Sequence, residues 1–268
     1  MNKIIGFIGA GNMGQAIVGG IVKAGLVPSE NIIMSDLYEP SLERAKNNYN
    51  IEVTTDNKLV ARKSDILILA VKPNLYSIVI NEIKDLVKED VVIVTIAAGK
   101  SIDSTEKSFG KELKVIRTMP NTPALVGEGM TAVCPNKLIT DEDISEVSSL
   151  LSSFSKVEVV SESLIDAVTS VSGSSPAYVY MFIEAMADAA VLQGMPRDKA
   201  YKFAAQTVLG SAKMVLETGM HPGALKDMVC SPGGTTIEAV SELEAKGFRS
   251  AVISAMNKCY EKSKEMSK

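Results

Sequence analysis

The fold is decided by the stretch Gly6-Phe7-Ile8-Gly9-Ala10-Gly11-Asn12-Met13-Gly14, because it places the pattern GxGxxG between an apolar run and a helical pattern. In a βαβ unit the first glycine of this pattern makes a tight turn, and the second lets the backbone approach a diphosphate. The third lets the helix pack closely on the strand, and free N–H groups at the helix start bind the diphosphate. The stretch predicts a dinucleotide site. The alternative is a fold whose nucleotide site is no longer used.

Short β-branched runs alternate with helical stretches up to about residue 160. We expect strands at residues 4–8, 32–35, 66–71, 91–96, 115–118, 130–134 and 157–160. Asp56, Ser101 and Thr140 are expected to begin helices as N-caps. This alternation predicts a largely parallel sheet covered by helices, as in a Rossmann-type domain.

Beyond Ser161 the strand patterns stop, and Ala-, Met- and Leu-rich segments with helical periodicity follow. The predicted fold class is therefore α/β plus all-α, with a Rossmann-type domain at residues 1–161 and a helical domain at residues 162–268. Residues 178–192 and 204–216 are apolar around most of their circumference, which a small helical domain cannot bury alone. We expect a partner subunit to cover them. The alternative is a helix buried between the two domains of one chain.

Composition excludes several classes of protein. The 268 residues carry 28 Lys and Arg against 32 Asp and Glu, a net charge of −4, so nothing indicates a nucleic-acid-binding surface. The three cysteines form no CxxC, and we expect no metal site. The sequence shows neither a leader nor an 18-residue apolar span. We expect a cytoplasmic protein that neither crosses nor binds a membrane.

Four further motifs indicate where ligands bind. Two motifs follow predicted strands, at the edge where open α/β sheets bind their ligands: Ala70-Val71-Lys72-Pro73 and Ala97-Ala98-Gly99. We expect both to form walls of the cofactor site. Arg117-Thr118-Met119-Pro120-Asn121-Thr122-Pro123 predicts a rigid loop after another strand, although Arg117 is equally well explained as an ion-pair residue. Residues 172–178 and 227–238 each open a helix with a turn rich in hydroxyl groups and glycine, which suits a small carboxylate.

The motifs GFIGAGNMG, AVKP, RTMPNTP, SGSSPAY and SPGGTTIEA occur in this order across nearly the whole chain, which resembles the pyrroline-5-carboxylate reductase family. The resemblance implies reduction of 1-pyrroline-5-carboxylate to L-proline, the last step of proline biosynthesis, with NADPH or NADH. It also implies that the helical domain intertwines with its twin in a homodimer or a larger assembly.

The family's functional residues carry over to matching positions. Cofactor contacts are implied at Ile8, Gly9, Ala10, Gly11, Asn12, Met13, Ser35, Asn57, Ala70, Val71, Lys72, Pro73, Ala97, Ala98 and Gly99. Contacts with the substrate, a cyclic imino acid, are implied at Glu162, Thr169, Ser231, Gly233, Gly234, Thr235 and Thr236. Many relatives carry Asn where this chain has Met228, so one polar cofactor contact is missing.

The chemistry of the side chains supports imine reduction. A hydroxyacid dehydrogenase needs a positioned acid such as His or Lys. The single histidine, His221, lies in a Gly- and Pro-rich turn, and residues 172–192 contain no Lys. A protonated cyclic imine needs no such acid, because it is already the electrophile.

Two residues have competing interpretations. Thr169 is predicted to accept a hydrogen bond from the ring nitrogen, the alternative being a buried threonine bonded back to a helix carbonyl. Glu162 either contacts the substrate indirectly or caps the first helix of the second domain.

The choice of cofactor stays open. Asp36 follows the second predicted strand, near the position where an acid binds the ribose of NADH and repels a 2′-phosphate. Ser35 is nevertheless placed to contact a phosphate, and the family resembles NADPH users. Two other functions also stay open: a related dehydrogenase of a short hydroxyacid or another cyclic imine, and a nucleotide-sensing protein without catalysis.

Overall fold

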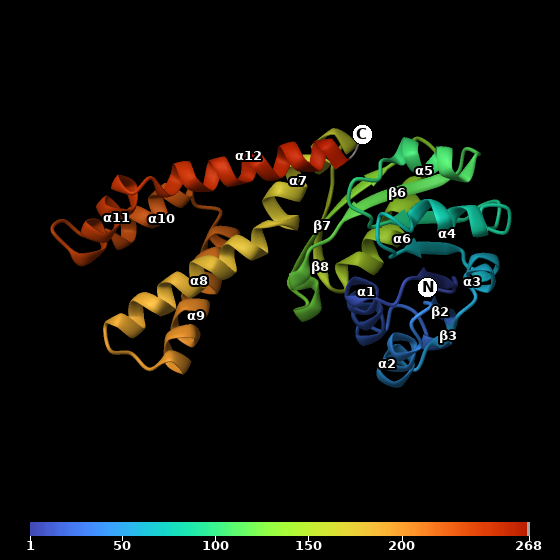
Figure 1. The fold of residues 1–268 in the computed structure, drawn as a ribbon, viewed down its shortest axis with the longest axis horizontal. Helices are drawn as coiled ribbons and strands as arrows, with labels where there is room; N and C mark the ends of the chain where they lie inside the picture. The colour runs from blue at the N-terminus through green and yellow to red at the C-terminus, as the bar shows by residue number, and fades with distance from the viewer. Residues whose placement is uncertain (267–268) are drawn as a thin grey trace. The chain divides into compact units, whose positions relative to one another are not determined.

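The computed structural model describes residues 1–266. Its contacts divide the chain into unit 1, which comprises residues 1–174 and 259–266, and unit 2, which comprises residues 175–258. Figure 1 shows a sheet covered by helices in the N-terminal part of the chain, followed by helices alone. The predicted α/β plus all-α fold class is confirmed.

Unit 1 is built on an eight-stranded sheet in the order β3-β2-β1-β4-β5-β6-β7-β8. Neighbouring strands are parallel except for the β6–β7 pair. The strands are β1 (Ile5–Ile8), β2 (Ile32–Ser35), β3 (Glu52–Thr54), β4 (Ile66–Leu69), β5 (Val92–Thr95), β6 (Lys114–Met119), β7 (Gly129–Pro135) and β8 (Ser155–Val159).

An apolar layer covers each face of this sheet. Side chains alternate along the strands, so Phe7 joins one layer and its neighbour Ile8 joins the other. The helices of the Phe7 layer are α1 (Asn12–Lys23), α2 (Glu39–Tyr49) and α6 (Asp141–Ser152). Those of the Ile8 layer are α3 (Asn57–Lys63), α4 (Tyr76–Ile83) and α5 (Ile102–Phe109). The expected N-caps Asp56, Ser101 and Thr140 each accept a backbone N–H of α3, α5 and α6 respectively.

Short helical segments complete unit 1. They are the 3-10 helices η1 (Ser29–Asn31), η2 (Thr122–Val126) and η3 (Glu162–Leu164), the helix α7 (Ile165–Val168) and the π-helix η4 (Thr169–Gly173). Ile165 is 1% exposed and belongs to the Ile8 layer, so the contacts of η3, α7 and η4 assign them to unit 1. The predicted domain boundary at residues 161 and 162 therefore precedes the division between units by thirteen residues, and it stays a prediction. Residues 267 and 268 of the predicted second domain lie outside the described residues.

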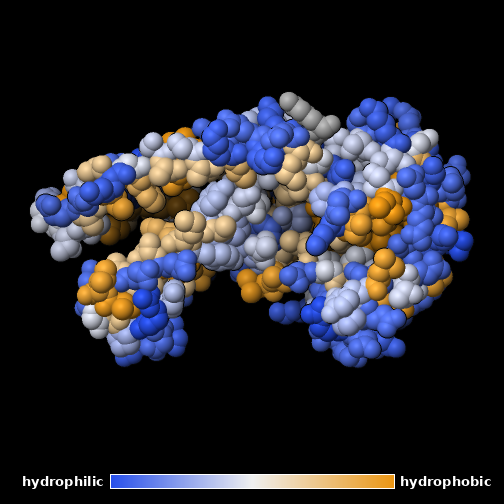
Figure 2. Space-filling model, viewed as in Figure 1, coloured by the Kyte–Doolittle hydropathy of each residue, from blue (hydrophilic) through white to orange (hydrophobic). Residues whose placement is uncertain are grey.

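Unit 2 consists of helices with little buried surface of their own. These are α8 (Ser175–Leu192), α9 (Arg197–Thr218), α10 (Pro222–Val229), α11 (Thr235–Ala245) and α12 (Phe248–Met266), whose last part lies in unit 1. Met181, Phe203 and Leu216 are 67%, 64% and 82% exposed, and Figure 2 shows apolar surface, in orange, over the helices. Among residues 1–266, no helix combines the length and apolar character needed to cross a membrane.

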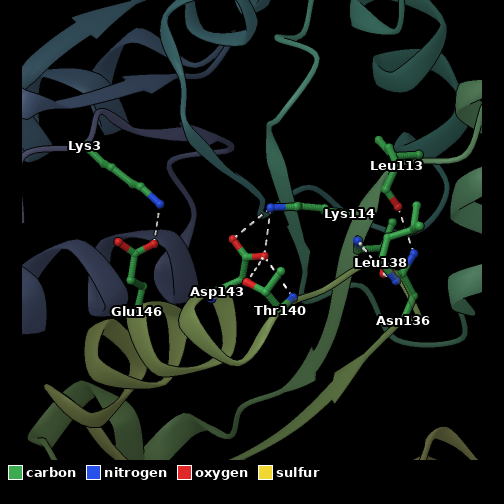
Figure 3. A network of polar contacts seen from close by, with 9 residues as sticks. Lys3, Leu113, Lys114, Asn136, Leu138, Thr140, Asp143 and Glu146 are labelled. Atoms are coloured by element: carbon green, nitrogen blue, oxygen red, sulfur yellow. Dashed lines mark hydrogen bonds and ion pairs between the residues drawn. The ribbon is translucent and has the colours of Figure 1, made fainter.

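A network of charged and polar groups lies at the amino edge of the sheet (Figure 3). Lys3, just before β1, pairs with Glu146 of α6, and Lys114 at the start of β6 pairs with Asp143 of α6 at 2.9 Å. The Asp143 carboxylate also accepts the backbone N–H of Thr140, which completes a capping box. Burial of Asp143 opposes its ionisation, but hydrogen bonds from Lys114 and Thr140 outweigh burial and lower its pKa.

We expect Asp143→Asn to lower the free energy of unfolding by about 1–2 kcal/mol at neutral pH, because it breaks a helix cap and a half-buried ion pair. The pKa of Asp143 is lowered from 3.8 in the folded chain, so ionised Asp143 stabilises the fold above about pH 4. That contribution disappears as the pH falls through the lowered pKa. Urea unfolding of both proteins between pH 7 and pH 2 measures the difference, which should shrink on acidification. Asp103→Asn, in the exposed pair with Lys107, is the matched control and should change stability by less than about 0.5 kcal/mol.

Candidate functional site

The three glycines of GxGxxG have three different structural requirements. Gly9 has a φ of +110°, and a Cβ built there would lie 2.5 Å from the Ala70 carbonyl oxygen. A Cβ at Gly14 would lie 2.5 Å from the Gly9 carbonyl oxygen, so helix α1 packs too closely for any side chain. A Cβ at Gly11 would meet nothing within 4 Å. The space above Gly11 is therefore open, as a diphosphate site requires.

Helix α1 presents backbone donors without a side-chain cap to this space. Its N-cap is Gly11, no side chain caps it, and its first turn contains no acidic residue. The first intrahelical bond is donated by Gln15 to the Gly11 carbonyl, so the N–H groups of Asn12 and Met13 precede the bonded turns. These donors and the positive end of the helix dipole fit a dinucleotide diphosphate.

The predicted walls of the cofactor site lie at the same carboxyl edge of the sheet. Ala70 follows β4 and donates its N–H to Ile8 at 2.8 Å, directly beside the Gly9 turn. Val71 and Pro73 are partly exposed, and Lys72 is exposed. After β5, the segment Ala97–Gly99 ends in a left-handed glycine with a φ of +72° and leads into α5. The structure thus brings the AVKP and AAG motifs to the edge that carries the glycine turn.

Three polar residues predicted to contact the cofactor are engaged with other groups. The Asp36 carboxylate accepts the Ala10 N–H at 2.7 Å and the Tyr38 N–H at 2.9 Å, which ties the loop after β2 to the glycine turn. Ser35 is fully buried and donates its hydroxyl to Asn57 Oδ1 at 2.8 Å. Asn57 in turn donates to Glu82. Each carboxylate oxygen has a second lone pair, so a ribose contact by Asp36 stays a prediction, as do the cofactor contacts of Ser35 and Asn57.

Thr169 opens the π-helix η4, a type of segment that is frequent at functional sites. Its hydroxyl donates to the Ile165 carbonyl at 2.8 Å, which is the alternative bond that its sequence context suggested. Because this bond uses the hydroxyl proton, the lone pairs of Oγ1 remain available to accept a hydrogen bond from a ligand. Asn121 holds η4 against the sheet, since its side chain donates to the Ser172 carbonyl at 3.1 Å and accepts the Met130 N–H at 2.8 Å.

Glu162 binds groups that the sequence did not pair with it. Its Oε1 accepts the Ile102 N–H at the start of α5 and a hydrogen bond from Arg117 Nη1, each at 2.8 Å. Glu162 therefore caps α5 and not the first helix of the second domain. The ion-pair interpretation of Arg117 agrees with this geometry, and an indirect substrate contact by Glu162 stays a prediction.

The SPGG segment forms a tight turn before α11 in unit 2. Gly233 has a φ of +65°, and the Gly234 N–H bonds to the Ser231 carbonyl at 3.0 Å. A Cβ at Gly234 would lie 2.4 Å from Ser231 Oγ, so the hydroxyl folds over this glycine. Helix α11 begins at Thr235 without a side-chain cap, so the N–H groups of Thr235 and Thr236 are available to a carboxylate.

Two other titratable groups have structural roles. His221 Nδ1 accepts the Gly223 N–H at 3.0 Å and caps α10, as expected of a turn residue. Burial raises the pKa of the Cys134 thiol to about 11, although Arg117 opposes the shift. With this pKa the thiol is protonated at neutral pH, whereas the thiolate is the nucleophilic form.

Comparisons with known proteins match both halves of the chain. Residues 162–266 match the family model described as pyrroline-5-carboxylate reductase dimerisation, and residues 4–99 match that described as NADP oxidoreductase, coenzyme F420-dependent. A pyrroline-5-carboxylate reductase of Escherichia coli is 55% identical over 100% of both chains. The chain belongs to the pyrroline-5-carboxylate reductase family.

Solved structures of pyrroline-5-carboxylate reductases share the whole fold. That from Coxiella burnetii superposes with a TM-score of 0.93 at 34% identity over 100% of both chains. That from Plasmodium falciparum, with NADP bound, has a TM-score of 0.91 at 35% identity and covers 100% of this chain and 99% of its own. The resemblance inferred from the motifs is confirmed.

Proposed function

We propose that this chain reduces 1-pyrroline-5-carboxylate to L-proline with NADPH or NADH, in the last step of proline biosynthesis. The observation that carries the proposal is the match to a pyrroline-5-carboxylate reductase at 55% identity over the full length of both chains. The open space above Gly11 and the uncapped start of α1 support the use of a dinucleotide. When bound, the cofactor supplies a hydride from nicotinamide C4 to the imine carbon C5, and the ring nitrogen keeps the proton it brought.

The residues of this chain bind and orient the imine. The N–H groups at the start of α11 hold the substrate carboxylate, with Ser231, Gly233, Gly234, Thr235 and Thr236 as the contributing residues. Thr169 Oγ1 accepts a hydrogen bond from the ring N–H, in agreement with its donation to Ile165. Glu162 contacts the substrate indirectly. No acid is required, because the protonated imine is already the electrophile.

An activity assay tests the proposal. Purified protein is mixed with NADPH or NADH and with pyrroline-5-carboxylate, 1-pyrroline or a panel of short ketoacids. In parallel it is mixed with NADP⁺ or NAD⁺ and a panel of short hydroxyacids, and absorbance at the nicotinamide band is followed in both series. We expect turnover with pyrroline-5-carboxylate, and a kcat/KM for 1-pyrroline that is lower by roughly 10- to 100-fold because the carboxylate contacts are lost. Turnover of hydroxyacids and ketoacids without turnover of either imine would establish the related-dehydrogenase alternative. Cofactor binding without any turnover would establish a nucleotide sensor.

Self-association is a further part of the proposal. The chain carries the family's dimerisation domain at residues 162–266, and we propose at least a homodimer formed through the helical residues. The exposure of Met181, Phe203 and Leu216 supports this, because such apolar surface is usually covered in solution. Light scattering at micromolar concentration should give a mass of at least twice 28.6 kDa. An active monomer would contradict the prediction.

We also propose a cytoplasmic location, which the three free cysteines support. Fractionation of cells that express the protein should recover the activity with the cytoplasmic enzymes.

A further inference from the structure

Arg117 is a buried cation whose hydrogen bonds are incomplete. The side chain projects from β6 and is 5% exposed. Nη1 donates to Glu162, but Nε is buried and has no hydrogen-bond partner within residues 1–266. A buried donor without a partner costs free energy. Apolar residues in place of both members of such a buried ion pair are often at least as stabilising, so the Arg117–Glu162 pair is not explained by stability alone.

The bonds that Arg117 does make connect two predicted parts of the site. Glu162 Oε1 receives both Arg117 and the Ile102 N–H, while Oε2 makes no hydrogen bond within residues 1–266. The Glu162 side chain is 33% exposed, so one carboxylate oxygen is anchored and the other can accept a donor. Ile102 is the first residue of α5, directly after the loop that contains Ala97–Gly99.

From this geometry we infer that Arg117 is a positioning residue for imine reduction, a role that rests on the proposed function. Arg117 fixes the Glu162 carboxylate in one orientation, with Oε2 directed away from the anchoring groups. Through Glu162 it also fixes the start of α5, and with it the predicted cofactor wall at Ala97–Gly99. Arg117 itself contacts neither substrate nor cofactor. Substitution of Arg117 should therefore change the kinetics only by displacing Glu162.

Kinetics of Arg117→Met, Glu162→Gln and the double variant test this inference. We expect Arg117→Met to raise KM for pyrroline-5-carboxylate and to lower kcat/KM by roughly 10- to 100-fold. KM for the cofactor should also rise, by a smaller factor, because only the wall at Ala97–Gly99 loses its support. Because Arg117 acts through Glu162, kcat/KM of the double variant should be no lower than kcat/KM of the less active single variant. Arg117→Lys keeps the positive charge but lacks the planar guanidinium group, so its loss of kcat/KM should be smaller than that of Arg117→Met.

Lys114→Met is the matched control, because Lys114 lies on the same strand and also pairs with an acid of a neighbouring element. It should leave kcat and KM unchanged. Hydrogen–deuterium exchange of the peptide that contains Ile102 supplies a readout that does not depend on activity. Protection of the Ile102 amide should fall in Arg117→Met but not in Lys114→Met.

The outcomes are distinct. Strictly additive losses in the double variant, or full activity of Arg117→Met, would overturn the positioning role. An equal loss of kcat/KM in Lys114→Met would show that the loss comes from general destabilisation of the fold. This outcome would also overturn the positioning role. Absence of imine reduction by the unmodified protein would instead refute the proposed function, and the exchange measurement would still show whether Arg117 holds the start of α5.

Discussion

Gly11→Val should weaken binding of NADPH and NADH by roughly 100- to 10,000-fold while leaving the fold intact. The valine side chain would fill the space above Gly11, where a Cβ would meet nothing within 4 Å, and would keep the diphosphate away from the N–H groups of α1. Loss of two hydrogen bonds to a charged group, at about 1.5–3 kcal/mol each, accounts for this range. Fluorescence titration measures the dissociation constants.

The fold should survive because Gly11 has a φ of −69°, which any residue can adopt. Gly14→Ala is the contrasting variant: its Cβ would lie 2.5 Å from the Gly9 carbonyl oxygen, so it should lower the free energy of unfolding. If Gly11→Val bound both nucleotides as tightly as the unmodified protein, the diphosphate site would have to lie elsewhere.

Thr169→Val should lower kcat/KM for pyrroline-5-carboxylate by roughly 10- to 150-fold, because it removes one hydrogen bond to a charged partner, about 1.5–3 kcal/mol. Complete loss is not expected, since Thr169 orients the imine without transferring a proton. Thr169→Ser keeps the oxygen and its bond to Ile165, so it should retain most of the activity. Steady-state kinetics at saturating cofactor measure these values.

His221→Ala supplies the control for general acid catalysis. His221 caps α10 through its contact with Gly223, so its loss should leave kcat nearly unchanged. An inactive His221 variant beside a fully active Thr169→Val would replace the proposed chemistry with one that requires an acid.

Local features were predictable because their physical causes lie within a few residues. The spacing of Gly9, Gly11 and Gly14 specifies the turn, and the hydroxyl groups of Ser101 and Thr140 each accept a backbone N–H only three residues away. Strand β3 was missed, because Glu52–Thr54 is short, lies at the edge of the sheet and shows no apolar run. Short edge strands depend on their neighbour for stability, and their own sequence signals them weakly.

Partners distant in sequence could not be predicted. Arg117 and Glu162 lie 45 residues apart, and no periodicity relates them. The bond between the Ser35 hydroxyl and Asn57, which lies 22 residues further along the chain, was likewise not predicted. Such contacts follow from the packing of complete elements, which a local pattern does not encode.

The return of the chain to unit 1 affects how the protein is made on the ribosome. Ser263 donates to Asp166 at 2.6 Å, and Cys259 Sγ lies 3.1 Å from Ser174 Oγ, so the end of α12 packs against segments translated about ninety residues earlier. Synthesis proceeds from the N-terminus, so these contacts form only after α12 has been synthesised. A nascent chain therefore cannot complete unit 1 before α12 has been synthesised. Truncated chains that lack α12 would expose the surface around Asp166 and Ser174 that α12 covers, and they would become substrates for proteolytic quality control.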